Sequence, residues 1–433
     1  MFALSAMSAS AKKSYWQTSL TFLLFFASWG IWWSFFQIWL TDPNGLNFDG
    51  KHVGTVYSAN SLAALILMFV YGALQDRLGI RRHVAIFASV LMTLVGPFLI
   101  FVYQPLLTNA FMLGVVVGAI FLSAGFISTC ALFEALGERL SRRFGFEYGQ
   151  ARMWGSFGYA IVALIAGFTF TRNPHLNFWL GSLFGLACLL VLIFCKDPQV
   201  SSQDDDTTEQ SDSENSMPGL KDMLALLHMK ALWVFIIFVL FSWTFYTVFD
   251  QQMFPDFYSS LFATQDQGRQ VYGVLNSIQV FVEAAMMGVV PLIMARLGVR
   301  KTLLLGITVM FLRIGGCALV DGPVLVSAVK MLHALEVPLA ILPIMRYFTL
   351  HFDPKLSATL YMVGFQIAAQ VGNIVFSTPL GMLRDHIGYR PTFYVIAVCV
   401  LAAGIFGSLI LKKDNEHVLG DPLVPNERKS RVA

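Results

Sequence analysis

Eight ionisable side chains fall inside long apolar runs of the sequence. An ionisable group at the centre of a bilayer costs about 2.5–3.5 kcal/mol on insertion scales, so such groups need a polar cavity or one another. We therefore expect them to line a polar pathway through the protein. The alternative is a set of structural ion pairs between helices. The eight residues are Glu134, Arg152, Asp250, Glu283, Arg313, Lys330, His333 and Glu336.

Among these residues there is one more acidic side chain than there are permanently positive ones. Four carboxyl groups stand against three permanent cations, with His333 in addition. A desolvated carboxyl group without a counter-charge tends to hold a proton. The count is typical of a proton-coupled carrier, and it fits an importer and an exporter equally well.

The densest group lies in one apolar run. Lys330, His333 and Glu336 are spaced by three residues, so they share one face of a helix. A single histidine on such a helix is usually a packed residue. We interpret His333, one turn from a carboxylate and an amine, as part of a proton relay. Pro338 follows within a turn and is expected to bend the helix.

Two further polar groups suit a sugar. Asp250 is followed by Gln251 and Gln252, whose amides can bond either sugar hydroxyls or a neighbouring helix. Glu134 and Arg152 stand at the facing ends of consecutive apolar runs, where a carboxylate and a guanidinium can form a bidentate clamp.

Aromatic side chains accompany this clamp. Tyr159 follows the small residues Gly155, Ser156 and Gly158, and its ring could cover one face of a sugar. Phe26 and Trp29 belong to an aromatic-rich run and could stack on a pyranose ring. For each ring the alternative is packing against lipid or another helix.

The composition places most of the chain in lipid. Of the 433 residues 56% are hydrophobic and 13% are charged, whereas a soluble protein carries roughly a quarter charged residues. This excludes an ordinary cytosolic enzyme, a disordered protein and a nucleic-acid binder. The net charge of +3 is too small to indicate a polyanionic partner. We find no nucleophile–base set and no metal-ligand spacing, so we predict neither an enzyme nor a cofactor.

Twelve stretches are long enough to cross a bilayer as helices, which takes about 20 largely apolar residues. They predict an all-α membrane protein. The expected spans are residues 17–40, 54–77, 83–105, 109–138, 149–171, 176–195, 231–257, 271–295, 302–320, 323–346, 356–383 and 391–411.

One long polar stretch separates two sets of six spans. Residues 197–229 contain Asp204, Asp205 and Asp206 with several serines, which predicts a flexible linker that ends in a short surface helix at 220–228. The predicted organisation is a tail, a six-helix bundle, the linker, a second bundle and a tail, at 1–16, 17–196, 197–229, 230–412 and 413–433.

The basic residues set the orientation. If both termini are cytoplasmic, most of the 29 Lys and Arg residues lie in inner tails and loops. The outer loops then hold Lys51, Arg172, Arg269, Arg384 and Arg390. Because cytoplasmic loops are enriched in Lys and Arg, we predict that both termini are inside.

A basic motif recurs six spans apart. Residues 77–82 read Arg-Leu-Gly-Ile-Arg-Arg, and residues 296–301 read Arg-Leu-Gly-Val-Arg-Lys. The matching register favours a duplication over two generic basic turns. It predicts two pseudo-symmetric six-helix halves, the architecture of major facilitator transporters. We interpret the fuller first copy as a gating loop formed by Gly72, Asp76, Arg77, Gly79, Arg81 and Arg82.

Three motifs resemble the oligosaccharide:proton symporters, the lactose permease group of the major facilitator superfamily. They are Phe146-Glu147-Tyr148-Gly149 with Ala151-Arg152-Met153, then Phe249-Asp250-Gln251-Gln252, and Lys330-x-x-His333-x-x-Glu336-Val337-Pro338. The resemblance covers residues 16 to 412.

The resemblance implies a role for each matching residue. Glu134 and Arg152 correspond to the sugar-binding pair, and Tyr159 stands where a tryptophan stacks on the sugar. Arg313, His333 and Glu336 correspond to the proton-coupling group. Asp250 and Lys330 correspond to an interhelical ion pair.

Several departures point to one branch of the family. A second charge pair of the lactose carriers is replaced by Thr247 and Ala369, and the helix-eight acid is displaced by about one turn, to Glu283. These choices, with Tyr159, resemble the sucrose-carrying branch. The resemblance therefore implies sucrose as substrate. Lactose, maltose or raffinose symport, a proton-coupled sugar or drug exporter, and a nontransporting sugar sensor remain as alternatives.

The expected mechanism is alternating access with one proton per sugar. Glu336 is the favoured proton acceptor, beside His333 and Arg313. Glu134 and Arg152 are expected to grip sugar hydroxyls at the midplane, with Gln251 and Glu283 as further contacts. The expected partners are a disaccharide, a proton and the lipid bilayer, and one chain is expected to suffice. The family resemblance implies a bacterial inner membrane.

Overall fold

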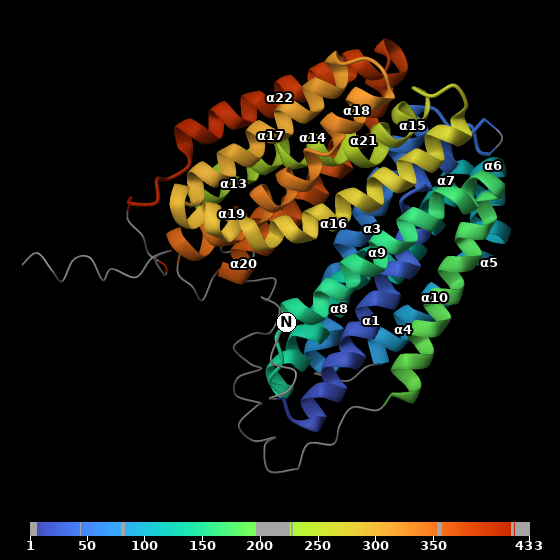
Figure 1. Ribbon diagram of the computed structural model, residues 1–433, viewed down its shortest axis with the longest axis horizontal. Coiled ribbons are helices and arrows are strands. Elements are labelled where there is room, and N and C mark those ends of the chain that lie inside the picture. Colours follow the sequence, from blue (N-terminus) through green and yellow to red (C-terminus); the bar gives the residue numbers. More distant parts are fainter. Residues whose placement is uncertain are drawn as a thin grey trace, which may run out of the picture. The chain divides into compact units, whose positions relative to one another are not determined.

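The regular structure of the chain is entirely helical over the part described by the computed structural model (Figure 1). Among the described residues, eleven helices are long and apolar enough to cross a membrane. A twelfth span results if His83–Thr93 and Val95–Asn109, bent by 47° at their junction, count as one. The predicted all-α membrane protein is confirmed. The structure describes residues 7–43, 45–78, 83–195, 226, 228–352, 357–416 and 420, apart from the side chains of 72–78 and 357–358.

Two predicted segments lie outside this description. Gly79, Arg81 and Arg82 of the gating loop are not described, and of Gly72, Asp76 and Arg77 only the helical backbone is. Most of the predicted linker, with its short helix, also falls outside the described residues.

Contacts divide the chain into two compact units. Unit 1 comprises Met1–Met217 and Pro255–Phe281, and unit 2 comprises Pro218–Phe254 and Val282–Ala433. The assignment of six spans to each half of the chain stays a prediction.

In unit 1 the first helix is central. α1 packs against α9 and α10 (Figure 1). A Cβ atom at Gly158 of α9 would lie 2.4 Å from the backbone oxygen of Leu23, so only glycine allows these backbones to come so close. The elements of this unit are α1 (Ala9–Trp33), α2 (Phe36–Thr41), α3 (Gly50–Leu78), α4 (His83–Thr93), α5 (Val95–Pro97), η2 (Phe98–Tyr103), α6 (Gln104–Asn109), α7 (Phe111–Leu122), η3 (Ser123–Ile127), α8 (Ser128–Phe144), α9 (Tyr148–Arg172) and α10 (Pro174–Phe194).

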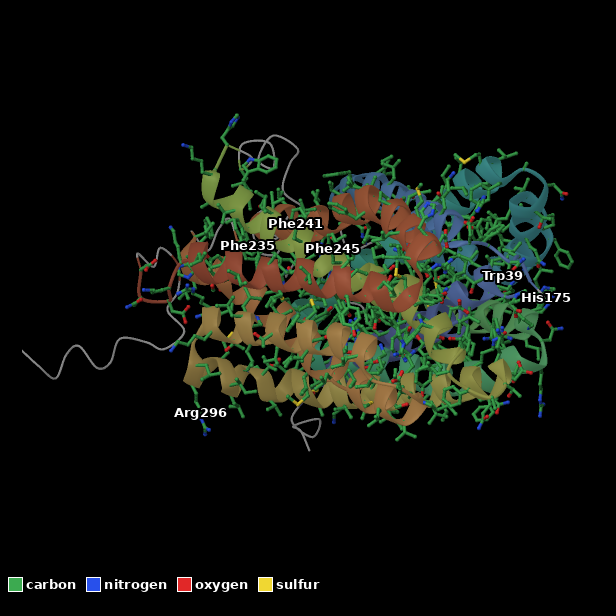
Figure 2. The ribbon with its side chains drawn as sticks, turned by 90° about the horizontal axis from the view of Figure 1, so that it is seen from above. Trp39, His175, Phe235, Phe241, Phe245 and Arg296 are labelled. Carbon is green, nitrogen blue, oxygen red and sulfur yellow. The ribbon has the colours of Figure 1, made fainter. Side chains whose placement is uncertain are left out.

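Unit 2 is built around α17, which packs against α19 and α22. Phe235, Phe241 and Phe245 follow one another along α13 and α14 (Figure 2), and the ring of Phe235 lies 4.6 Å from that of Phe348 on α19. Its elements are α13 (Lys230–Phe241), α14 (Trp243–Val248), η5 (Phe249–Met253), α17 (Val299–Leu319), α18 (Pro323–Lys330), α19 (His333–His351), α20 (Ser357–Tyr361), η7 (Met362–Ile367), α21 (Ala368–Ile387) and α22 (Tyr389–Ile410).

Two further helices cross the boundary between the units along the chain. They are α15 (Phe254–Ser259) and α16 (Gln265–Leu297). The first part of α16 packs on α9, where a Cβ atom at Gly273 would lie 2.9 Å from the backbone oxygen of Ala163.

Arg269 holds this part of α16 within unit 1. The sequence placed it in an outer loop, but it lies in the first turns of α16 and is 8% exposed. Its guanidinium lies 3.1 Å from the carboxylate of Asp42, which is also buried. Apolar periodicity did not reveal this pair because its partners are far apart in the chain.

Four segments, η2, η3, η5 and η7, have π-helical hydrogen bonding. Such segments are rare and often occur at functional sites. η5 is the one that carries Asp250, Gln251 and Gln252.

The buried pair gives a first prediction. Asp42→Ala should lower the free energy of unfolding by about 3–5 kcal/mol, because it leaves the guanidinium of Arg269 buried without its nearest carboxylate. Thermal unfolding of the purified protein measures this. The double variant Asp42→Asn/Arg269→Gln should regain much of the loss.

The matched control is Asp321→Ala. Asp321 lies 2.6 Å from Arg390, but its side chain is 86% exposed, so its removal should change stability by less than about 1 kcal/mol. Equal losses for Asp42→Ala and Asp321→Ala would contradict a stabilising role for the buried pair.

Candidate functional site

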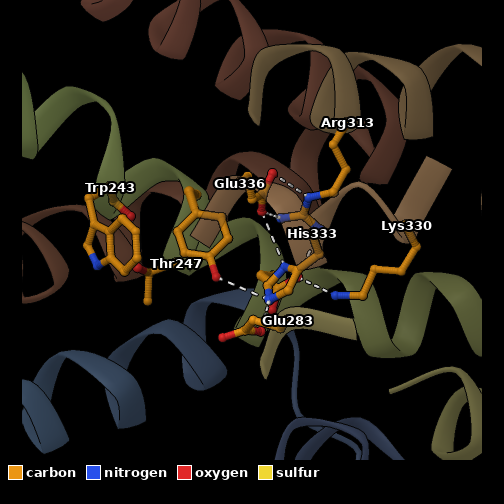
Figure 3. Close-up of polar contacts among 9 residues, drawn as sticks. Trp243, Thr247, Glu283, Arg313, Lys330, His333 and Glu336 are labelled. Atoms are coloured by element: carbon orange, nitrogen blue, oxygen red, sulfur yellow. Dashed lines mark hydrogen bonds and ion pairs between the residues drawn. The ribbon is translucent and has the colours of Figure 1, made fainter. Parts of the chain in front are cut away.

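Six of the eight ionisable residues come together in unit 2 (Figure 3). They come from five elements, η5, α16, α17, α18 and α19, that together extend over residues 249 to 351. The six are Asp250, Glu283, Arg313, Lys330, His333 and Glu336, and we call them the charge cluster.

Arg313 and Glu336 form the innermost contact of the charge cluster. Nε of Arg313 donates to Oε2 of Glu336 at 2.9 Å, and Nη2 lies 2.6 Å from Oε1. Both side chains are fully buried. This ion pair, with a hydrogen bond between Nε and Oε2, partly offsets the desolvation of both charges.

Asp250 joins three basic groups through one oxygen. Its Oδ1 accepts from Nζ of Lys330 at 2.6 Å and from Nη1 of Arg313 at 2.9 Å, and lies 3.3 Å from Nδ1 of His333. The sequence suggested Lys330 alone as its ion-pair partner. In the structure Asp250 also links Lys330 to the Arg313–Glu336 contact.

His333 lies between the acids of the charge cluster. Its Nδ1 is 3.2 Å from Oε1 of Glu336, and its Nε2 is 4.0 Å from Oε2 of Glu283. The hydroxyl of Tyr246 lies 3.4 Å from the same Nε2. The imidazole therefore lies within ion-pair distance of a carboxylate on either side.

A helix break positions these groups. The span predicted over 323–346 is present as one span, Pro323–His351, but its helix is interrupted: α18 ends at Lys330 and α19 begins at His333, with a turn at Met331 and Leu332 between them. Pro338 lies within the first turns of α19 rather than at this break.

The charge cluster is one positive charge short. It contains three carboxylates, Asp250, Glu283 and Glu336, and two permanent cations, Arg313 and Lys330. One proton therefore makes it neutral, whether it rests on His333 or on an acid. A desolvated site favours neutrality, so a single bound proton would lower the electrostatic cost of this burial.

The other two ionisable residues meet in unit 1. Nε of Arg152, near the start of α9, donates to Oε1 of Glu134 on α8 at 2.9 Å. Their side chains are 28% and 38% exposed, unlike those of Arg313 and Glu336. This pair, which we call the clamp, is electrically neutral by itself and accessible.

Aromatic rings support the clamp from α1. The guanidinium of Arg152 lies over the ring of Phe26, 4.1 Å from its centre. A Cβ atom at Gly155 would lie 2.6 Å from Phe26 and 3.0 Å from Arg152, so glycine is needed there. Trp29 stands next to Phe26, with 6.2 Å between the ring centres. Tyr159 packs on Gly30 of α1.

The two glutamines of η5 differ in their surroundings. Gln251 is exposed, whereas Gln252 is buried and donates from Nε2 to the hydroxyl of Ser377 at 2.9 Å. Gln252 thus ties η5 to α21, and Gln251 is the more exposed of the two.

Some contributing residues were missed from the sequence. Tyr246 contacts His333, and the ring of Phe249 lies 4.9 Å from the guanidinium of Arg313. Tyr246 precedes Asp250 by one helical turn, and this spacing was the available signal. Among the residues that the structure describes, no group of three or more His, Cys, Asp or Glu is arranged to hold a metal ion.

Comparison with known proteins gives consistent matches. The family model described as LacY proton/sugar symporter matches residues 7–423. The sucrose permease of Escherichia coli is 40% identical over 97% of this chain and 99% of its own length. The raffinose permease of Escherichia coli is 34% identical over 93% of this chain and 94% of its own length. These relatives are transporters, which agrees with the prediction that the chain is not an enzyme.

Solved structures show the same fold. The nucleoside transporter NupG superposes with a TM-score of 0.76 at 16% identity, over 92% of this chain and 99% of that one. A D-xylose–proton symporter superposes with a TM-score of 0.64 at 13% identity, over 93% and 98%. The predicted major facilitator fold is confirmed.

The connectivity of Asp250 gives a second prediction. Asp250→Ala should cost about 3–5 kcal/mol of stability, because Lys330 loses its nearest carboxylate in a buried place. Lys330→Met should cost clearly less, because Asp250 keeps Arg313 and His333 as neighbours. Thermal unfolding of both purified variants measures the difference. The reverse order would show that Asp250 is not the group that links the charge cluster.

Proposed function

The chain belongs to the LacY proton/sugar symporter family, and on that premise we propose that it imports sucrose together with a proton. The sucrose permease matches this chain over almost the full length of both proteins. We place the protein in a bacterial inner membrane as an integral multi-pass protein, in agreement with its relatives.

The proposed coupling to a proton rests on one observation, the balance of positive and negative groups in the charge cluster. Two permanent cations face three carboxylates, and His333 contacts or approaches all three. We propose that one proton enters the charge cluster, with Glu336 and His333 as its sites. That proton neutralises a desolvated region. Binding and release of the proton therefore change which conformation of unit 2 is favoured.

The clamp is the proposed binding site for the sugar. Arg152 donates five N–H groups in a fixed plane, and Glu134 accepts, so together they can bind neighbouring hydroxyls on one hexose ring. Phe26 and Trp29 offer apolar faces for the ring, as does Tyr159. Gln251 and Glu283 are proposed as further sugar contacts, since both are at least partly exposed.

Neutral residues replace a possible second charge pair. The hydroxyl of Thr247 donates to the backbone oxygen of Trp243 at 2.8 Å, and Ala369 is 9% exposed. No permanent charge at either position needs a counter-ion. The proton of the charge cluster is then the one that couples sugar entry to the membrane, where a charge moved across 100 mV gains about 2.3 kcal/mol.

The first test is uptake of labelled sucrose into cells that lack other sucrose carriers. We expect accumulation above the outside concentration, and we expect a protonophore to abolish it because the gradient drives entry. Raffinose, lactose and maltose are added as competitors. Uptake of raffinose instead of sucrose would keep the mechanism and change the substrate. Export from everted vesicles, with no uptake, would favour an exporter.

The charge count predicts a specific variant. In Glu336→Gln two carboxylates face two permanent cations, so the charge cluster is neutral without a proton. We expect uphill accumulation to be lost, while exchange of internal for external sucrose stays within about threefold of the wild type. Labelled counterflow and proton-driven uptake measure the two activities.

The matched control is Glu138→Gln. Glu138 is an exposed residue of α8 paired with Arg142 on the same helix, so both activities should persist. Loss of exchange together with accumulation in Glu336→Gln would argue against a role in the proton step alone.

A further inference from the structure

A row of aromatic rings extends beyond the clamp. Phe26, Trp29 and Trp33 are spaced by three and four residues, so they lie on one face of α1. Their ring centres are 6.2 Å apart from Phe26 to Trp29 and 5.9 Å from Trp29 to Trp33. Tyr57 of α3 continues the row, 5.7 Å from Trp33. We call these four residues the aromatic track.

The aromatic track is longer than one hexose ring. Trp33 lies seven positions after Phe26, which is about 10 Å along a helix. Arg152 lies over Phe26, so the clamp serves one end only. A single hexose ring held by Glu134 and Arg152 would leave the Trp33 end unused, whereas two linked rings would cover both ends.

An unusual asparagine shares one face of α3 with Tyr57. Asn60 follows Tyr57 by three residues on α3 and is 2% exposed. Neither its amide nitrogen nor its amide oxygen has a hydrogen-bond partner among the described residues. A buried polar group left unpaired costs about 1–3 kcal/mol, so packing alone does not account for an amide here.

Another asparagine shows what a structural role looks like. Asn177 is fully buried, and both ends of its amide are bonded: the nitrogen donates to Ala166 and the oxygen accepts from Thr169. At Asn60 the bond to another element goes to the backbone, whose oxygen accepts from the hydroxyl of Ser123 at 2.9 Å. This bond fixes the backbone of α3 against η3 and leaves the side chain for another partner.

We propose that Trp33, Tyr57 and Asn60 form a second sugar subsite, which binds the hexosyl ring of the disaccharide that the clamp does not hold. A hexose has apolar C–H faces that pack on an aromatic ring, and rim hydroxyls that both donate and accept. The indole of Trp33 suits the face, and the amide of Asn60 suits a pair of hydroxyls. Because Asn60 is closed to solvent in this structure, it meets sugar in the state of the transport cycle in which the aromatic track opens.

This inference rests on the proposed disaccharide import and deepens it. In this proposal residues of α1 and α3 select between disaccharides. The clamp binds the hexose ring that different disaccharides have in common. A site built to bond a hydroxyl discriminates strongly against a sugar that lacks it there.

The test is the transport kinetics of Asn60→Leu. Leucine has a similar volume and removes the unpaired amide, so the protein should unfold at the wild-type temperature or above. We expect KM for sucrose to rise roughly tenfold or more, the equivalent of about 1.4 kcal/mol, with the maximal rate within about twofold. A wild-type KM in this stable variant would overturn the proposal and leave Asn60 as a packing residue.

Two further variants keep the test decisive. If Asn60→Leu does not reach the membrane, Tyr57→Phe is tested instead, since it removes one hydroxyl from the same subsite. We expect this variant to raise KM for sucrose, and an unchanged KM would overturn the proposal. Asn177→Leu is the control, and it should lower thermal stability while the KM of the folded protein stays unchanged.

The same assay separates this proposal from the proposed function. If the wild type accumulates no sucrose, the proposed function fails first. If the wild type accumulates sucrose and Asn60→Leu does so with the same KM, the second subsite alone is wrong.

Discussion

The contact between Arg313 and its two carboxylates is the interaction on which the rest depends. A guanidinium that is fully buried cannot be deprotonated, so its charge must be matched by the protein. Glu336 matches it from α19, and Asp250 matches it from η5. Since Asp250 also binds Lys330, helices from three parts of the chain are held in register around one charge. His333 and the remaining acid Glu283 are then placed where a proton completes the balance.

The charged groups of the two units differ in burial, and this difference matches the different roles proposed for them. In the charge cluster Arg313, Lys330 and Glu336 are closed to solvent, and the group is one positive charge short, so one proton would make it neutral. The clamp of Glu134 and Arg152 is neutral and partly exposed, so it can meet an uncharged sugar without a large change in electrostatics. A carrier needs this difference, because a sugar site that titrated by itself would bind protons whether or not sugar was present.

Irregular helix geometry places the polar groups. Asp250, Gln251 and Gln252 lie on the π-helical η5, which turns Gln251 outward and Gln252 toward Ser377. The turn between α18 and α19 separates Lys330 from His333. In unit 1 glycine has the corresponding role, since Gly155 allows Phe26 to lie beneath Arg152. These local departures adjust side chains that belong to the charge cluster and the clamp.

The sequence by itself determined the helical spans, the eight ionisable residues within them, the excess acid and the resemblance to a family. These features depend on composition and local spacing. Because burying a charge in lipid is costly, charged residues within apolar runs can be recognised from the sequence. Tertiary structure decided which groups meet: that Asp250 bridges both cations, that Arg269 is buried against Asp42, and that the amide of Asn60 is left unpaired. In a membrane the lipid face of a helix is as apolar as its packed face, so periodicity does not reveal which side faces a neighbour. The partners of each charge therefore emerge only when distant helices pack together.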